Sequence, residues 1–176
     1  MYIARFNESE GSVETLKGHL LNVSFFGEKF GLRSATPQFL KLAGLLHDIG
    51  KYTDEFQGYI TRKIEENKSK VKSEEKGPDH GVYGAKYIFE KYKNDNDVDK
   101  RLTAEMMATI CCYHHGGLPD CIGKTLSGEL KIPLCTRMSQ IDKKQMEVVM
   151  ERFKNDAGIS ENLITDMFDQ ANIEIV

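Results

Sequence analysis

The chain has 176 residues, of which 40% are hydrophobic and 29% are charged, enough apolar material for one compact domain. Its formal net charge of −3 excludes the overall basicity that marks many nucleic-acid-binding proteins. A phosphodiester substrate remains compatible with this charge, because a bound metal ion can supply positive charge locally. The first ten residues show no secretion signal, and no stretch approaches the roughly 18 apolar residues of a membrane span. We therefore expect a cytoplasmic protein with no membrane partner.

The four cysteines are Cys111, Cys112, Cys121 and Cys135, and no two of them have C-x-x-C spacing. This favours reduced thiols in the core or in loops, as is usual in the cytosol. A structural zinc site is the alternative, but Cys111 and Cys112 are adjacent and therefore poorly spaced for one ion.

Two helices are predicted near the start of the chain. Apolar residues recur at three- and four-residue steps over residues 13–26, which is helical periodicity, and this helix should end within residues 27–31. A second helix should begin at Pro37, with Thr36 as its cap, and break at Gly50. Because it is apolar on nearly every side, we expect it to be central and buried.

The rest of the chain also reads as helices joined by polar segments. No strand alternation persists and no internal repeat is found, so the predicted class is all-α. Residues 118–137 contain two prolines and two glycines, which indicates a long irregular excursion that could include a short hairpin. The further helices are predicted at about residues 54–67, from residue 78 onward, and at residues 102–113, 143–153 and 161–170.

All five histidines of the chain fall on or beside a predicted helix, where they could face one shared centre. His19 lies within a helix and His80 at a helix start, and each by itself is more typical of a core histidine or a plain cap. The joint placement of all five favours a metal site. The five are His19, His47, His80, His114 and His115.

The first local signature is the pair His47–Asp48 at the end of a buried apolar helix. An ionised carboxylate is costly there unless a cation or hydrogen-bond donors compensate it. Imidazole and carboxylate together suit a divalent first-row metal, and the two oxygens of Asp48 could bridge two ions. The alternative is that Asp48 simply pairs with Lys51 while His47 packs in the core.

The second signature is His114–His115 followed by two glycines, Gly116 and Gly117. A histidine and a glycine are common at the end of a helix, where the dipole favours one and the cap favours the other. That explanation accounts for one residue of each kind. It does not account for two consecutive histidines at one helix end.

The order of these motifs resembles the HD superfamily, and more narrowly the HD nuclease of type I CRISPR interference. The narrower resemblance rests on three stretches between His19 and Asp120, the last being the most specific. They are Leu45-Leu46-His47-Asp48-Ile49-Gly50-Lys51 with Phe56-Gln57, Asp79-His80-Gly81 with Gly84-Ala85, and His114-His115-Gly116-Gly117-Leu118-Pro119-Asp120.

The resemblance implies an HD-domain helical bundle that cleaves single-stranded DNA with one or two divalent metal ions. It implies that His47 and Asp48 anchor the centre, that His19 serves one metal, and that His80, His114 and His115 serve the other. It gives Asp48 and Lys51 catalytic roles, with Lys51 facing the scissile phosphate. Mixed imidazole and carboxylate ligands favour Mn, Fe, Co or Ni over Mg. The implied partners are a helicase domain, in cis or in trans, and a guide-RNA surveillance complex.

One feature departs from the family pattern, which usually has a further metal-binding aspartate on a late helix. Asp166 and Asp169 are late aspartates, but their surroundings do not reproduce the Ala-Asp-rich motif. We therefore expect residues 1–176 to be a single HD nuclease domain cut from a longer nuclease-helicase chain.

Two other interpretations are open. An HD phosphohydrolase acting on a small nucleotide would need the same ligands, and an inactive HD-like scaffold would need none of them. A run of lysines at Lys68, Lys70, Lys72 and Lys76 could touch a DNA backbone, although the interspersed glutamates favour a solvated loop.

Overall fold

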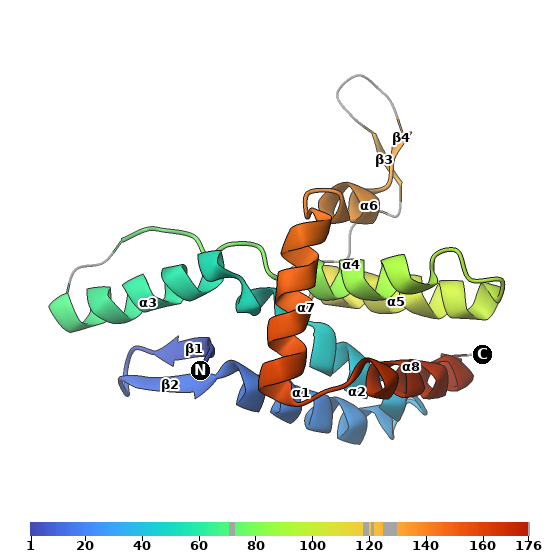
Figure 1. Ribbon diagram of the computed structural model, residues 1–176, viewed down its shortest axis with the longest axis horizontal. Coiled ribbons are helices and arrows are strands. Elements are labelled where there is room, and N and C mark those ends of the chain that lie inside the picture. Colours follow the sequence, from blue (N-terminus) through green and yellow to red (C-terminus); the bar gives the residue numbers. More distant parts are fainter. Residues whose placement is uncertain (71–72, 118–119, 121, 125–129, 176) are drawn as a thin grey trace.

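The computed structural model describes residues 1–70, 73–117, 120, 122–124 and 130–175 (Figure 1). The described part is a bundle of eight α-helices with one 3-10 helix and two short hairpins, so the all-α prediction is confirmed. The helices are α1 (Leu16–Gly31), α2 (Pro37–Leu46), α3 (Asp54–Ser69), α4 (Gly81–Tyr92), α5 (Val98–Tyr113), α6 (Pro133–Met138), α7 (Lys143–Ala157) and α8 (Glu161–Ile175). The 3-10 helix is η1 (Ile49–Tyr52), and the strands are β1 (Ile3–Asn7), β2 (Ser12–Thr15), β3 (Gly123–Lys124) and β4 (Leu130–Lys131).

Helix α2 forms the centre of the bundle, as its apolar sequence predicted. It packs against α1, α8 and α5, and Leu42 and Leu46 are fully buried. A leucine buried in this way contributes about 1.5–3 kcal/mol relative to an exposed one. In Figure 1, α1, α2 and α8 lie together at the bottom, α4 and α5 run side by side to the right, and α7 stands upright across the front. The C-terminal end of α2 therefore lies inside the molecule.

The N-terminal segment is a β-hairpin, which corrects the predicted start of the first helix. Strands β1 and β2 pair antiparallel, with Phe6 opposite Val13, and Gly11 turns the chain with a positive φ of 65°. Helix α1 therefore begins at Leu16 and not at Val13. The β-branched residues at positions 13 and 15 favour a strand, and Thr15 then caps the helix by accepting a hydrogen bond from the Gly18 amide.

Other boundaries shift by a few residues. Helix α4 begins at Gly81, so Pro78 and Asp79 precede it, and α5 begins early at Val98 because Asp97 caps it. The excursion predicted over residues 118–137 is partly wrong, because Pro133 opens the short helix α6. A short hairpin, β3–β4, is present there among the described residues.

The start of α2 is capped by a residue that the sequence did not indicate. Thr36 occupies the cap position, but its side chain makes no capping hydrogen bond. The carboxylate of Glu174, near the end of α8, accepts hydrogen bonds of 2.9 Å from the amides of Gln38 and Phe39. A carboxylate at a helix N-terminus satisfies free amides and is favoured by the helix dipole.

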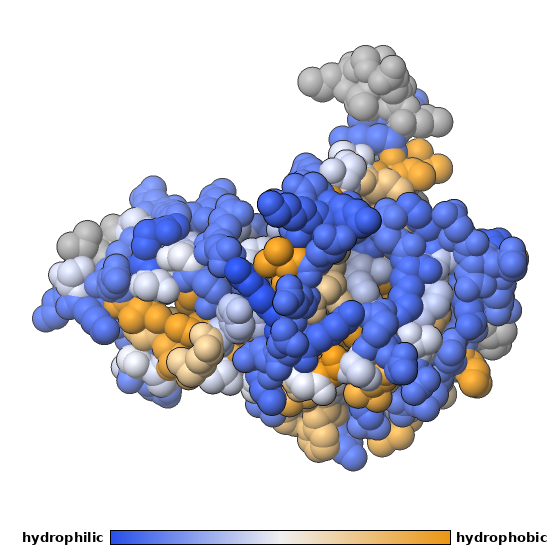
Figure 2. Space-filling model, viewed as in Figure 1, coloured by the Kyte–Doolittle hydropathy of each residue, from blue (hydrophilic) through white to orange (hydrophobic). Residues whose placement is uncertain are grey.

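The face seen in Figure 2 is mostly hydrophilic, with scattered hydrophobic patches, as is usual for the surface of a domain. Among the residues that the structure describes, no helix combines the length and apolar character needed to cross a bilayer.

Candidate metal centre

Four separate parts of the bundle bring the predicted site residues together. His19 projects from α1, while His47 and Asp48 follow the last residue of α2. The other histidines occupy helix ends. His80 immediately precedes α4, and the pair His114–His115 directly follows α5.

The carboxylate of Asp48 lies at the middle of this cluster, with a different group of histidines at each oxygen. Oδ2 lies 3.0 Å from Nε2 of His19 and 3.1 Å from Nε2 of His47. Oδ1 lies 3.2 Å from Nε2 of His80 and 3.1 Å from Nε2 of His114. His115 completes the second group, because its Nε2 is 2.8 Å from Nε2 of His80. Asp48 therefore separates the cluster into an Oδ2 group and an Oδ1 group.

Backbone carbonyls set the tautomer of three imidazoles, that is, which ring nitrogen carries the proton. Nδ1 of His47 lies 2.8 Å from the Gly44 carbonyl, and Nδ1 of His114 lies 2.8 Å from the Cys111 carbonyl. Nδ1 of His80 contacts the carbonyl of Pro78, two residues earlier, at 3.1 Å. A carbonyl oxygen can only accept, so Nδ1 must carry the proton in each ring. In the neutral ring, Nε2 then presents its lone pair to Asp48, which is the arrangement that binds a metal.

The donor set fits a divalent transition metal. Nε2 lone pairs that face a carboxylate, or each other at 2.8–3.3 Å, repel unless protons or a metal ion lie between them. Oδ1 of Asp48 and Nε2 of His114 are both buried, and neither has a partner with hydrogen-bond geometry among the described residues. The potential ligand atoms within each group lie within 4.8 Å of one another. Imidazole nitrogen and carboxylate oxygen together suit Mn, Fe, Co or Ni.

The electrostatics of the cluster favour an ionised Asp48. Its side chain is only 3% exposed. Burial raises the pKa of this carboxyl, but the contacts with His114, His19, His47 and His80 outweigh burial and hold the pKa well below its usual range.

His115 is the most exposed of the five histidines. Burial, together with the neighbouring His114 and His80, lowers its pKa, so that the ring is neutral at pH 7. A neutral ring is the form that coordinates a metal.

Lys51 also contacts Asp48. The alternative interpretation, in which Asp48 pairs with Lys51 while His47 packs in the core, is therefore correct in part. Its Nζ lies 2.8 Å from Oδ2 of Asp48, and its side chain is 10% exposed. Nζ also lies 5.3 Å from the centre of the Phe56 ring. The ion pair exists, yet His47 does not simply pack in the core, because its Nε2 faces the same carboxylate.

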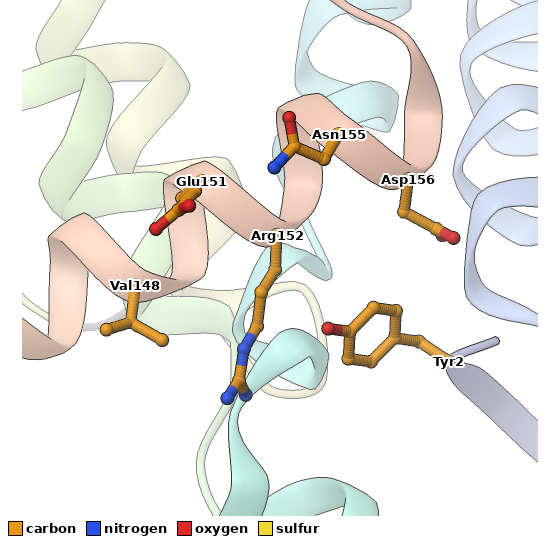
Figure 3. Close-up of a pocket in the computed structure, with 6 residues that line it drawn as sticks. All are labelled: Tyr2, Val148, Glu151, Arg152, Asn155 and Asp156. Atoms are coloured by element: carbon orange, nitrogen blue, oxygen red, sulfur yellow. The ribbon is translucent and has the colours of Figure 1, made fainter.

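Helix α7 holds η1, the segment that carries Lys51. Arg152 of α7 donates to the Tyr52 carbonyl at 2.8 Å and pairs with Asp54, while the Tyr52 hydroxyl donates to Asp156 at 2.9 Å. Figure 3 shows Arg152 and Asp156 on the same helix, with the ring of Tyr2 beside them. These residues line a pocket of about 480 Å³. None of the predicted site residues lines this pocket.

Two glycines allow the elements of the centre to approach closely. A Cβ atom at Gly50 would lie 2.2 Å from the carbonyl oxygen of His80, and one at Gly84 would lie 2.1 Å from that of Leu46. The sequence predicted that the second helix breaks at Gly50. Its φ is not positive, so the reason for glycine is the space that the His80 segment needs.

One contact near the centre was missed in the sequence. Oε2 of Glu14, on β2, lies 3.4 Å from Nδ1 of His19. A carboxylate behind a metal-binding histidine commonly orients the ring. No local signal marks Glu14, because its role depends on how the hairpin packs beside α1.

Other predicted residues lie elsewhere. Asp166 and Asp169 belong to neither group of potential ligands in the described chain, and Asp169 instead pairs with Lys100 at 2.6 Å. Cys111 and Cys112 are buried in α5, and Cys135 is exposed. Three positions named in the sequence, Leu118, Pro119 and Cys121, lie outside the described residues.

The lysine-rich segment begins within α3, because that helix continues to Ser69. Its acidic and polar residues fold back on the helix, since Glu75 pairs with Arg62 at 2.6 Å and Ser73 accepts from Lys63 at 3.0 Å. Lys68, Lys70 and Lys76 are exposed, and Lys72 lies outside the described residues. The DNA contact suggested for these lysines stays a prediction.

A helical bundle that surrounds a buried aspartate with histidines defines a candidate metal-dependent hydrolase. Comparison with protein-family models matches residues 16–147, or 132 of the 176 residues, to the HD domain. The chain belongs to the HD domain family, whose members are metal-dependent phosphohydrolases. A comparison with curated proteins found no significant match.

Proposed function

We propose that this chain is a metal-dependent nuclease that cleaves single-stranded DNA in type I CRISPR interference. The observation that carries the proposal is the position of Asp48, whose two oxygens face two separate groups of histidines. This arrangement suits a centre of two metal ions, or of one ion in whichever group binds it more tightly. The motifs around Asp48, His80 and His114 support the narrower assignment by their resemblance to that nuclease.

In the proposed centre, His19 and His47 would hold one ion together with Asp48, and His80, His114 and His115 would hold the other with the same carboxylate. When bound, such ions polarise a phosphoryl oxygen and lower the pKa of a water. The residues of the chain supply the rest. The backbone carbonyls behind His47, His80 and His114 hold the rings in place, and Lys51 provides a positive charge beside the phosphate.

The proposed partners are single-stranded DNA, a helicase domain and a guide-RNA surveillance complex. The net charge of −3 is compatible with a DNA substrate, because bound metal ions would supply positive charge locally.

The first test is cleavage of labelled single-stranded DNA by the purified chain with Mn²⁺. We expect cleavage that EDTA abolishes and that Asp48→Ala reduces by at least about a hundredfold, because that variant removes the carboxylate shared by both groups. Asp166→Ala is the matched control, since this exposed aspartate of α8 belongs to neither group. It should cleave like the unmodified chain.

The same assay includes nucleoside monophosphates as a second substrate. Metal-dependent hydrolysis of the monophosphates without cleavage of DNA would favour the alternative function, a phosphohydrolase of small nucleotides. Activity on neither substrate, in a folded chain with Mn²⁺, would contradict both.

A further inference from the structure

The Oδ1 group depends on two segments that do not belong to the same element. His80 lies in the segment before α4, and its side chain makes no cap hydrogen bond to that helix. His114 and His115 lie just beyond α5. The separation of these segments decides whether the three imidazoles can reach Oδ1 of Asp48 together.

Arg137 of α6 contacts both segments at once. One guanidinium nitrogen pairs with the carboxylate of Asp79, the residue before His80. The other donates to the carbonyl of Cys112 at 2.7 Å. The guanidinium also lies 4.8 Å from the centre of the Tyr113 ring, the residue before His114. A planar guanidinium with several fixed donors is suited to joining groups in this way.

We call Arg137 with its contacts to Asp79 and Cys112 the clamp. The clamp lies beside the metal centre and does not enter it. Arg137, Asp79, His114 and His115 line one cavity of about 240 Å³. The side chain of Arg137 is 30% exposed, and its charge is neutralised by Asp79. Its contacts are with the neighbours of the histidines, so it would act through them and not on substrate.

We propose that Arg137 is a positioning residue that fixes the His80 segment against the end of α5 and so shapes the Oδ1 group of the metal centre. The inference rests on the proposed metal centre. It assigns a role to α6, which contributes no residue to either group of potential ligands. The Oδ2 group of His19 and His47 lies on other elements and should not depend on Arg137.

The test is the binding of Co²⁺ to the full chain, measured by calorimetry and by the visible absorption of the bound metal. We expect Arg137→Ala to weaken binding at the Oδ1 group about tenfold or more, as is typical when support behind a metal ligand is lost. Arg137→Lys should restore little, because an ammonium cannot join both segments in the same plane. Arg62→Ala is the matched control, since Arg62 of α3 forms an ion pair with Glu75, and this pair includes none of the residues that Arg137 joins.

Two backgrounds separate positioning from a general loss of structure. In a His80→Ala chain the Oδ1 group is already impaired, so adding Arg137→Ala should have little further effect. In a His19→Ala chain the Oδ1 group is intact, so adding Arg137→Ala should have its full effect. Equal effects in both backgrounds would overturn the proposal.

Asp79→Asn provides a second variant in case Arg137→Ala does not fold. It weakens the same clamp from the other side and should also weaken the binding of Co²⁺. An unmodified chain that binds no Co²⁺ would overturn the metal centre and the clamp with it. Equal Co²⁺ affinity of the unmodified chain and the folded variants would overturn the clamp alone.

Discussion

At the scale of single residues, two opposing effects act on the carboxylate of Asp48. Its carboxylate is buried, which is costly by itself, and is surrounded by imidazoles and by the ammonium of Lys51. Lys51 contacts Oδ2, the same oxygen that faces His19 and His47. In a metal-bound centre the ammonium and the cation therefore compete for the same negative charge.

This competition gives a prediction for Lys51→Met, which removes the charge but keeps an unbranched apolar stem. We expect the affinity for Mn²⁺ to be unchanged or higher, because the repulsion between the ammonium and the metal is lost. Cleavage of DNA should fall about a hundredfold, because a positive charge beside the phosphate is lost. Calorimetry with Mn²⁺ and initial rates measure the two effects separately.

Lys100→Met is the matched control, since it removes an ion pair with Asp169 that joins α5 and α8. It should leave both quantities unchanged. A Lys51→Met chain that loses Mn²⁺ affinity in parallel with cleavage would show instead that Lys51 supports the fold of the centre.

At the scale of elements, α2 shows how one helix depends on the far end of the chain. Its first turn contains no acidic residue, and its cap residue Thr36 makes no side-chain cap hydrogen bond. Glu174 supplies the acceptor, and with it fixes the end of α8 against the start of α2. His47 directly follows the last residue of the same helix, so the position of α2 affects the centre.

We predict that Glu174→Gln lowers the free energy of unfolding by about 1 kcal/mol, because an amide is a weaker acceptor and carries no charge for the helix dipole. Urea denaturation followed by circular dichroism measures the change. Glu147→Gln is the control, since Glu147 and Lys143 form an exposed pair at 3.7 Å, and it should change the stability by about 0.5 kcal/mol or less. Equal effects of both substitutions would contradict the capping role.

At the scale of the whole molecule, Glu161 joins three helices. It accepts hydrogen bonds from Lys91 and Tyr87 of α4 at 2.5 Å each, and it pairs with Lys154 of α7 at 2.5 Å. Burial raises the pKa of Glu161, but the bonds from Lys154, Lys91 and Tyr87 outweigh it and lower the pKa to about 2. In the folded chain the carboxylate therefore stays ionised at pH values well below 4.5, its unperturbed pKa.

A lowered pKa in the folded state means that the ionised carboxylate stabilises the fold. This stabilisation is fully present above pH 4.5 and is lost as the pH falls toward about 2. We predict that Glu161→Gln costs about 1 kcal/mol at pH 7, after allowance for the screening of a partly exposed group. The difference from the unmodified chain should disappear between these two pH values.

Thermal unfolding of both chains across this pH range provides the measurement. A difference that is constant with pH would show that the hydrogen bonds and not the charge of Glu161 carry the effect.

The sequence predicted most helices and most members of the candidate site because both depend on local signals. The periodicity of α2 predicted a central helix, and the pairs His47–Asp48 and His114–His115 were recognisable as short motifs. The hairpin was missed because Val13 fits a helical pattern as well as a strand. Whether Val13 lies in a helix or in a strand depends on its pairing with Phe6 across the turn at Gly11.

By itself, then, the sequence determined the helical class and the identity of the five histidines and Asp48 as site candidates, since these follow from residue types and their spacing. Only the tertiary structure decided that Oδ1 and Oδ2 of Asp48 face different histidines, and that Arg137 and Glu174 support elements far from them in sequence. Arg137 contacts Asp79, 58 residues away, and Glu174 contacts Gln38, 136 residues away. Contacts of that kind arise from the packing of whole helices, and no pattern of neighbouring residues specifies them.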